Sequence, residues 1–203
     1  MSQNVGFFIA LDGPKHSGKS TLLALLTPLL HAMDIHAFLT KEPSIHFHLE
    51  NEEAYSGEDL ARLLANDRRR HLDEVILPAL HAYDVVISDR YIASSLGFQV
   101  LDGVPFETVW AMNNQFLLPD LNVFLVADEE ILKQRRAGRG MYTRIERSSN
   151  VADEILLYGK ISDFLSHLGV DTITIENNDS TSRSETAQRL AVAIAKKISE
   201  HNE

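Results

Sequence analysis

Residues 7–20 have the sequence FFIALDGPKHSGKS, in which a short apolar run leads directly into the pattern G-x-x-x-x-G-K-[ST], from Gly13 to Ser20. This pattern binds phosphate when it joins a strand to the start of a helix. Glycines let backbone N–H groups turn toward phosphate oxygens, and the helix N-terminus adds partial positive charge. The sequence therefore predicts a phosphate-binding loop; the alternative is a glycine-rich turn that holds no ligand.

The loop residues have distinct expected roles. Lys19 is expected to bridge the terminal phosphates of a bound nucleotide, and the hydroxyl of Ser20 is expected to coordinate Mg²⁺. The residues expected to bind the nucleotide are Gly13, Lys15, His16, Ser17, Gly18, Lys19, Ser20 and Thr21.

A second element, Asp89-Arg90, follows the strand-like run 84–88. A carboxylate at the end of a strand can hold Mg²⁺ directly or through water, and the neighbouring guanidinium can bind a phosphate with two hydrogen bonds. The alternative is that Asp89 caps the next helix while Arg90 is solvated. Downstream of a phosphate-binding loop, the sequence favours the functional interpretation.

Strand-like apolar runs alternate with helical patterns along the chain. Strands are expected over 5–11, 35–40, 84–88, 121–126 and 171–175, and helices over 18–30, 58–81, 106–117, 129–137, 151–168 and 184–199. Short apolar strands separated by helices predict a parallel sheet covered on both faces. No repeat, low-complexity tract or linker divides the chain, so we expect a single α/β domain over residues 1–203.

The composition excludes several classes of protein. The 203 residues are 44% hydrophobic and 24% charged, which is typical of a globular domain. The chain contains no Cys, which rules out a disulfide scaffold and a thiolate metal site. The net charge of −10 argues against a general nucleic-acid-binding protein. The longest apolar stretch, 21–30, is too short to span a bilayer, and no basic cluster marks a secretory signal, so a cytoplasmic protein is expected.

Further segments extend the phosphate-binding loop into a family pattern. In chain order they are 8–13, Lys41-Glu42-Pro43-Ser44, 65–71, 89–99, Pro119-Asp120-Leu121, and Arg139-Gly140 with Arg144-Ile145-Glu146. These segments resemble the thymidylate kinase family of nucleoside monophosphate kinases over about residues 5–165. The run N-K-x-D, typical of GTPases, does not occur.

The resemblance implies both a fold and an activity. The fold is that of a P-loop kinase, with a five-stranded parallel sheet flanked by helices, a lid at about 138–150 and assembly into a homodimer. The activity is transfer of the ATP γ-phosphoryl group, with Mg²⁺, to dTMP or a similar nucleoside 5′-monophosphate, without nucleic acid or membrane as a partner. No general base is needed because the acceptor phosphate is already ionised, so catalysis consists of positioning and charge stabilisation.

The resemblance places the acceptor nucleotide on Lys41, Glu42, Leu64, Arg68, Arg90, Ser94, Ser95, Phe98 and Gln99. Arg68 also stands out by its spacing, because it lies four residues after Leu64 and four before Leu72, on or beside the apolar stripe of its helix. A buried guanidinium needs a partner or a ligand, and in the family this arginine hydrogen-bonds the thymine carbonyl. The alternative is that it extends to solvent at the edge of the stripe. Arg69 and Arg70 are expected on a solvated face.

Several positions depart from the family pattern, among them Lys41-Glu42-Pro43-Ser44, where the family has R-E-P-G. Lys15 stands where the family has an acidic residue that holds the sugar 3′-OH, and Leu64 stands where it has a Phe that stacks on the base. Phe98 replaces a Tyr, and Thr143 replaces an Asp of the lid. From Lys15 we hypothesise that the acceptor is a modified or more anionic nucleotide, or that dTMP is a poor substrate. The alternative is that Lys15 points to solvent or pairs with Glu42.

Positive charge near the transferred phosphoryl group is expected from the lid. His16 stands at the loop position where some members place a catalytic arginine, and it is mostly uncharged at pH 7. Arg135 and Arg139 match the lid arginines of other members, whereas Arg136 fits a basic side chain that complements the helix C-terminus. The expected catalytic residues are Lys19, Arg90, Arg135 and Arg139.

Two further hypotheses concern other functions. His46 and His48 alternate in a loop without a third ligand, so surface positions are expected rather than a metal site. A non-catalytic nucleotide-binding regulator is the alternative to a kinase. A regulator could lose any of the site residues without unfolding, so their joint retention argues against one; these residues are Lys19, Ser20, Asp89, Arg90 and Arg139.

Overall fold

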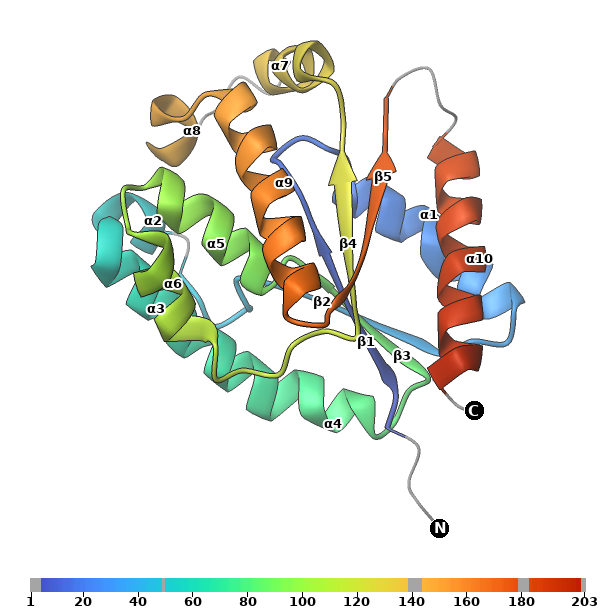
Figure 1. The fold of residues 1–203 in the computed structure, drawn as a ribbon. Helices are drawn as coiled ribbons and strands as arrows, with labels where there is room; N and C mark the ends of the chain where they lie inside the picture. The colour runs from blue at the N-terminus through green and yellow to red at the C-terminus, as the bar shows by residue number, and fades with distance from the viewer. Residues whose placement is uncertain (1–4, 49, 139–143, 179–182, 202–203) are drawn as a thin grey trace.

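The structure of the chain is a computed structural model that describes residues 5–48, 50–138, 144–178 and 183–201. Five strands form one parallel sheet in the order β2-β3-β1-β4-β5, which runs through the middle of the molecule (Figure 1). The strands are β1 (Phe7–Asp12), β2 (Ala37–Lys41), β3 (Val85–Asp89), β4 (Leu121–Val126) and β5 (Asp171–Glu176). The predicted α/β fold with a five-stranded parallel sheet is confirmed.

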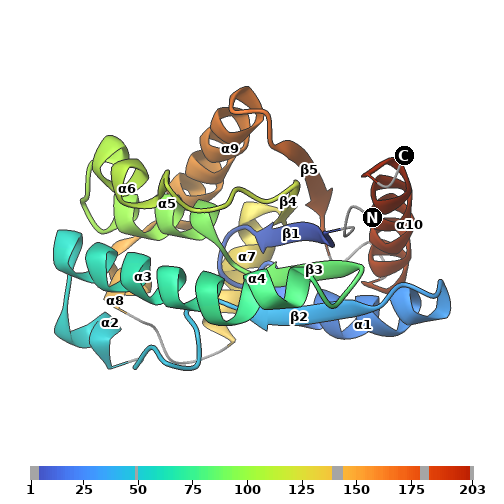
Figure 2. The same cartoon turned by 90° about the horizontal axis from the view of Figure 1, so that it is seen from below.

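Helices cover both faces of the sheet (Figure 2). One face carries α1 (Lys19–Ala32) and α10 (Arg183–His201), which pack against each other. The other face carries α3 (Gly57–His71), α4 (Leu77–Leu80), α5 (Ile92–Leu101), α6 (Phe106–Asn113) and α9 (Val151–His167). The shorter helices α7 (Glu129–Ala137) and α8 (Arg144–Ser148) lie beyond the carboxyl ends of β4 and β5, and α2 (Asn51–Ala54) lies near α8.

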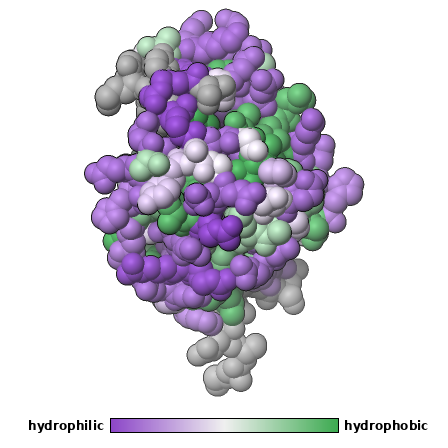
Figure 3. Space-filling model, turned by 90° about the vertical axis from the view of Figure 1, so that its left-hand side faces the viewer, coloured by the Kyte–Doolittle hydropathy of each residue, from purple (hydrophilic) through white to green (hydrophobic). Residues whose placement is uncertain are grey.

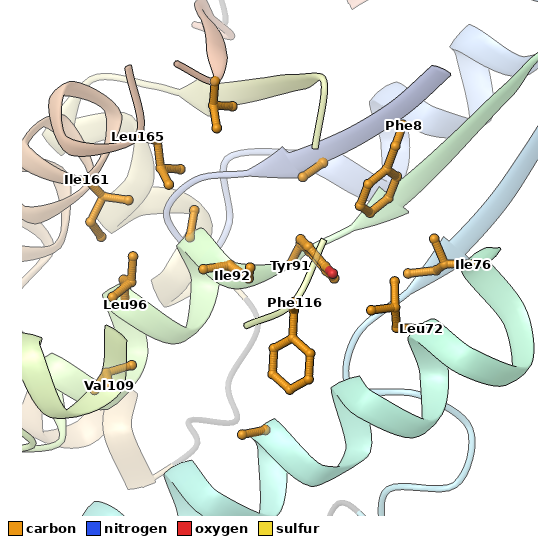
Figure 4. Close-up of a cluster of buried hydrophobic side chains, with 14 of the residues drawn as sticks. Phe8, Leu72, Ile76, Tyr91, Ile92, Leu96, Val109, Phe116, Ile161 and Leu165 are labelled. Atoms are coloured by element: carbon orange, nitrogen blue, oxygen red, sulfur yellow. The ribbon is translucent and has the colours of Figure 1, made fainter. Parts of the chain in front are cut away.

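Alternate residues of β1 pack into different cores. Phe7, Ile9 and Leu11 belong to the core under α1 and α10, whereas Phe8 and Ala10 belong to the core under the helices of the opposite face. Figure 4 shows the second core around Phe8. Alternation with a period of two is the geometry of a strand, and burial on both faces explains why the sequence of β1 is apolar throughout.

The order of the strands determines where a ligand can bind. β1 lies in the middle of the sheet, with β2 and β3 on one side and β4 and β5 on the other, so the strand order reverses direction at β1. In parallel α/β sheets, a crevice for ligands forms at the carboxyl ends of the strands at such a point. Asp12 ends β1 and Asp89 ends β3, and the register of these strands pairs Leu11 with Asp89. The predicted phosphate-binding loop therefore begins beside the predicted Asp89-Arg90 element.

Most elements lie within two residues of their predicted bounds, but the helix expected over 58–81 is not uniform, and the one expected over 106–117 ends at Asn113. The long helix is α-helical to His71, has a π-helical segment over Leu72–Ile76 and continues as α4. Pro78 has no N–H to donate, so the regular i→i−4 ladder cannot pass through it. This proline accounts for the change of helix type in the preceding turn.

Periodicity alone did not predict α5. Seven of its ten residues are buried, because the helix is enclosed by α3, α6 and α9. A helix that is buried on all sides has no polar face and therefore no amphipathic signal.

The outer surface near α2, α3 and α8 is mainly polar, with small apolar areas between the polar side chains (Figure 3). Within the described ranges, no helix is both long and apolar enough to cross a membrane.

Candidate active site

The turn between β1 and α1 has the backbone of a phosphate-binding loop. Gly13 and Gly18 have φ values of 131° and 99°, which side-chain-bearing residues rarely adopt. A Cβ at Gly13 would lie 2.2 Å from the carbonyl oxygen of Leu125, so the loop passes directly over β4. His16 also has a positive φ, 66°, and this strained conformation lies in the middle of the loop.

Lys19 is held inside this loop. Its side chain is 5% exposed, and Nζ donates to the carbonyl oxygens of Gly13 (3.0 Å) and Pro14 (2.7 Å) and to Ser17 Oγ (3.2 Å). Burial and the neighbouring Arg90 lower the pKa of Lys19 to about 7. An ammonium surrounded by loop carbonyls can exchange them for phosphate oxygens, the role that the sequence predicts for this residue.

Ser20 and Asp89 provide oxygen atoms that suit a divalent cation. Ser20 Oγ donates to Asp89 Oδ2 at 3.0 Å, and Asp89 Oδ1 is buried without a hydrogen-bond partner among the described residues. A hydroxyl and a carboxylate are the donors that Mg²⁺ prefers, and a buried, unpartnered carboxylate oxygen is open to coordination. The residues present therefore fit the predicted metal site.

A donor hollow surrounds the start of α1. The residues that line it include His16, Gly18, Lys19, Ser20, Thr21, Asp89, Arg90, Arg135, Gly138, Asn177 and Arg183. Arg135, on α7, donates to the carbonyl oxygens of Asn177 (2.9 Å) and His16 (3.4 Å), so it lies against the phosphate-binding loop. The other predicted lid arginine, Arg139, lies outside the described residues.

An acceptor cavity lies on the other side of Arg90. It is partly enclosed and opens to solvent. Its lining is Lys15, Glu42, Pro43, Glu52, Leu60, Leu64, Asp67, Arg68, Arg90, Tyr91, Ser94, Ser95, Phe98, Gln99 and Ile145. Arg90 is the only described residue that lines both the donor hollow and the acceptor cavity.

Arg90 itself occupies an unusual position. Its φ is 76°, and its N–H donates to the carbonyl oxygen of Leu11 at 2.9 Å, which holds the turn after β3 against β1. Its Nη1 lies 3.3 Å from Ser94 Oγ, and its guanidinium lies 4.9 Å from the centroid of the Phe98 ring. The strained turn therefore directs this side chain to the boundary between the two sites.

Arg68 is buried at the base of the acceptor cavity, with 3% of its surface exposed, which contradicts the alternative that it extends to solvent. Its guanidinium donates to Glu42 Oε2 (2.6 and 2.9 Å), to Ser95 Oγ (2.9 Å) and to Asn113 Oδ1. Arg69 and Arg70 are exposed, as predicted. The buried cation therefore has the partners it needs, and the sequence did not identify Asn113 as one of them.

Glu42 is held by a second buried contact. His71 Nδ1 lies 3.3 Å from Glu42 Oε1, and His71 Nε2 lies 2.6 Å from Thr40 Oγ1. A hydrogen-bond network thus runs from β2 through His71 and Glu42 to Arg68. Because the network fixes Glu42, it also fixes the direction of the guanidinium in the cavity.

Gln99 presents an unsatisfied acceptor to the cavity. The residue is 3% exposed, and its Oε1 has no hydrogen-bond partner among the described residues. A buried amide oxygen without a partner costs free energy, so this atom calls for a donor from a ligand. Leu64 and Phe98 add apolar surface nearby, as the sequence predicted for these positions.

Two lysines depart, one partly and one fully, from the places predicted for them. Lys15 was expected among the donor-binding loop residues and also, from the family pattern, beside the acceptor sugar; its side chain lines the acceptor cavity, with Nζ 5.2 Å from the Phe98 centroid. Lys41 was expected at the acceptor, but it lines a separate exposed hollow beside Ser20 and Asp89. Lys41 is the last residue of β2, the edge strand beside β3, and this position directs it away from the cavity.

Sequence reasoning missed Asp12 and Asn177. Asp12 is fully buried, accepts from Ser94 Oγ (2.6 Å) and from the Tyr91 N–H (3.1 Å), and has a pKa raised by burial. Asn177 Nδ2 donates to the Ser17 carbonyl oxygen at 2.6 Å. The position of Asp12 at a strand end was the same signal that identified Asp89, whereas no local pattern marks Asn177, which follows β5.

The helix α8 covers one side of the acceptor cavity. Its Arg144 pairs with Asp102, at the end of α5, through both carboxylate oxygens, and Arg147 pairs with Glu53 of α2 at 3.0 Å. Ile145, which follows Arg144 in α8, is buried and lines the acceptor cavity. The described part of the predicted lid is therefore docked over the acceptor site.

His46 and His48 show no metal geometry. His46 Nε2 lies 3.9 Å from Glu74 Oε2, and the described residues contain no group of three or more side chains that could hold a metal ion through His, Asp or Glu.

Comparisons with known proteins agree with this geometry. The chain matches the family model described as thymidylate kinase over residues 11–162. It is 36% identical over 146 residues to a probable thymidylate kinase of Staphylothermus marinus, covering 68% of this chain and 72% of that one. It is 34% identical over 143 residues to a thymidylate kinase of Geobacillus thermodenitrificans, covering 64% of each. A probable thymidylate kinase of Pyrococcus abyssi is 29% identical over 178 residues, covering 81% of this chain and 87% of that one.

Proposed function

Because the chain belongs to the thymidylate kinase family, we propose that it transfers the γ-phosphoryl group of ATP to the 5′-phosphate of dTMP, forming dTDP and ADP. The observation that carries this proposal is the meeting of two sites at Arg90. One is a phosphate-binding loop with its buried lysine, and the other is a cavity with a guanidinium and an amide oxygen at its base. A nucleoside monophosphate in the cavity would direct its phosphate toward Arg90.

The base of the cavity suits a pyrimidine with an imide group. Four of the five N–H groups of Arg68 donate to Glu42, Ser95 and Asn113, which leaves one N–H on Nη1 to complement a base carbonyl. Gln99 Oε1 is an acceptor without a partner among the described residues, which complements a ring N–H. Thymine offers a carbonyl oxygen and an N–H on adjacent ring atoms. The apolar side chains of Leu64 and Phe98 provide contact for the ring faces.

The transfer itself requires positioning more than proton chemistry. An oxygen of the ionised acceptor phosphate attacks the γ-phosphorus, and the bond between that phosphorus and the β,γ-bridging oxygen breaks. Lys19 and Arg90 stabilise the charge on the transferred group and the phosphates around it, while Arg135 holds the loop through the carbonyl of His16. Ser20 and Asp89 would hold Mg²⁺, which supplies charge neutralisation on the ATP phosphates.

Arg139 is proposed as the second lid arginine near the transferred group. An arginine supplied in this way is worth about 10³-fold or more in rate, so Arg139→Ala is expected to lower kcat by about that factor. Steady-state rates with saturating ATP and dTMP measure the effect. A variant with nearly the wild-type kcat would exclude Arg139 from the catalytic set.

We further propose that the protein is a cytoplasmic homodimer, the assembly and location that the family resemblance implies. Light scattering coupled to gel filtration of the purified protein measures the mass directly. A mass near twice the 22.8 kDa of the chain is expected, and a monomer at assay concentration would contradict the dimer.

The activity is tested by a screen of ATP consumption with each common nucleoside monophosphate, dTMP and dUMP included. The expected result is turnover of dTMP that is lost in Lys19→Ala, the matched variant for the phosphate-binding loop. Turnover of another nucleotide but not dTMP would assign a different acceptor. ATP binding without any turnover would instead favour a nucleotide-binding regulator.

A further inference from the structure

A buried carboxylate from α9 contacts the phosphate-binding loop. Glu154 is 4% exposed, and its Oε1 accepts a hydrogen bond from the backbone N–H of Lys15 at 2.8 Å. The two residues are 139 positions apart in the chain. This contact joins the third residue of the loop to the helix that follows the lid.

Glu154 occupies a position where an apolar residue would be expected. The buried residues of α9 are Val151, Glu154, Tyr158, Ile161 and Leu165, which together form one helical stripe. Placing a carboxylate in such a stripe is unfavourable unless it is hydrogen-bonded and its charge is compensated. Burial raises the pKa of Glu154, whereas the Lys15 N–H and the nearby Lys19 and Arg90 oppose that shift. The groups that stabilise the charge of the buried Glu154 carboxylate, namely the Lys15 N–H, Lys19 and Arg90, therefore all belong to the two nucleotide sites.

The hydrogen bond holds the loop at the residue where it divides the two sites. Lys15 lines the acceptor cavity, with its ammonium beside the Phe98 ring, whereas the next residue, His16, lines the donor hollow. His16 has a positive φ, so the chain turns sharply at this point. Because Glu154 binds the N–H of Lys15, it determines how this part of the loop faces the acceptor cavity.

We propose that Glu154 is a positioning residue that holds the acceptor-facing part of the phosphate-binding loop through the N–H of Lys15. This role rests on the proposed function, and it assigns a specific part in acceptor binding to a residue outside the lining of either site. Only two residues separate α9 from α8, and Ile145 of α8 lines the same cavity. Two walls of the acceptor cavity are therefore attached to one helix.

Three variants separate the reach of the side chain from its charge. Glu154→Ala removes the acceptor, Glu154→Asp keeps the charge but shortens the side chain by one methylene, and Glu154→Gln keeps an oxygen at the same distance without the charge. Asp153→Asn is the matched control, because Asp153 is the adjacent acidic residue on the exposed side of α9. Each variant is compared with the wild type for KM of dTMP, KM of ATP and kcat.

The expected result is a selective effect on the acceptor. Loss of one hydrogen bond to a charged group corresponds to about tenfold in affinity, so Glu154→Ala and Glu154→Asp should raise the KM of dTMP about tenfold. The KM of ATP should stay within about twofold, and Glu154→Gln and Asp153→Asn should stay near the wild type. An equal rise in both KM values, or an unchanged KM of dTMP in Glu154→Asp, would overturn the proposal, as would Glu154→Gln behaving worse than Glu154→Asp.

A second readout is independent of turnover. In protein labelled with ¹⁵N-lysine and free of nucleotide, the Lys15 amide proton should resonate downfield because it donates to a carboxylate, and this shift should be lost in Glu154→Ala and Glu154→Asp. If the wild type phosphorylates no nucleotide, the proposed function fails, but the amide shift still decides whether Glu154 holds Lys15. An unchanged Lys15 resonance in both variants would refute the positioning role even in an active enzyme.

Discussion

At the scale of single residues, the site depends on charges placed where burial makes them costly. Lys19 is enclosed by loop carbonyls, Arg68 is surrounded by Glu42, Ser95 and Asn113, and Asp12 is fully buried. Buried ionisable groups of this kind cluster at functional sites, because a ligand completes their interactions. Each of them therefore predicts a measurable response to pH or to substitution.

The lowered pKa of Lys19 predicts proton uptake when ATP binds. With a pKa of about 7, Lys19 in the free protein is largely neutral at pH 8.5, whereas contact with phosphates favours the ammonium form. ATP binding should therefore take up close to one proton at about pH 8.5 and almost none at about pH 6. Calorimetric titrations in buffers with different ionisation enthalpies measure this uptake. Uptake that does not change over this pH range, or that persists in Lys19→Met, would contradict the assignment.

Lys15 predicts a change in acceptor preference. Its ammonium lies in the wall of the acceptor cavity, at the position where the family has an acidic residue. If this charge selects against ordinary dTMP, then Lys15→Asp should raise kcat/KM for dTMP, by about tenfold for one regained hydrogen bond. Lys15→Gln, which removes the charge without adding an acceptor carboxylate, is the control. Without an improvement in Lys15→Asp, the hypothesis of a more anionic acceptor loses its support.

At the scale of elements, the site forms where several helices and loops meet at the carboxyl edge of the sheet, and no single element contains it. The phosphate-binding loop follows β1, Arg90 follows β3, and the base of the cavity is formed by α3 and α5. Helix α8 closes one side through the pairing of Arg144 with Asp102, whose carboxylate also accepts from the Gly57 N–H at 2.7 Å. This pairing links α8, α5 and α3 around the acceptor cavity.

Removal of Asp102 should weaken the docking of α8. We expect Asp102→Ala to raise the KM of dTMP by about three- to tenfold, because a partly exposed ion pair contributes about this much, with little change in the KM of ATP. Hydrogen exchange of the α8 amides, which should become faster, measures the docking directly. Asp153→Ala, on the exposed side of α9, is the control. Unchanged exchange in α8 would show that other contacts hold it.

The same pair predicts a dependence on acid. Burial alone would raise the pKa of Asp102, but hydrogen bonds from Arg144 and from the Gly57 N–H outweigh it and hold the pKa below its usual value. A lowered pKa means that docking is complete above the ordinary aspartate pKa of about 3.9 and is lost as the pH falls below it. In the wild-type protein, the α8 amides should therefore exchange as quickly as those of Asp102→Ala only when the pH is below about 3.9.

At the scale of the whole molecule, one sheet separates two hydrophobic cores and carries the site at its carboxyl edge. Leu26 of α1 is 1% exposed in the core beneath α1 and α10. Leu26→Ala should lower the free energy of unfolding by about 3 kcal/mol, the typical cost of such a cavity. Leu156→Ala, at a position 61% exposed on α9, should change it little. Denaturant titrations of both variants measure the free energy of unfolding. An equal decrease in the two variants would contradict the burial of Leu26 in this core.

The amount that could be predicted differs between local and distant features. The phosphate-binding loop, the strands and most helices were recognised from consecutive residues, and the roles of Lys19, Ser20 and Asp89 are predictions from the same local patterns. These features depend on backbone conformation and periodicity, which nearby residues decide. The position of Lys41 was predicted wrongly, because this residue lies near the site in sequence but faces a different hollow from the acceptor cavity.

The amino-acid sequence alone was enough to identify the α/β class, the phosphate-binding loop and the family resemblance, because each depends on short segments with characteristic residue spacing. The tertiary structure was needed to show that Asn113 holds Arg68 and that Glu154 holds the loop. These partners are 45 and 139 residues apart, and no local sequence pattern pairs either of them with its partner. Such contacts depend on how the helices pack over the sheet, and packing is a property of the whole chain rather than of any local segment.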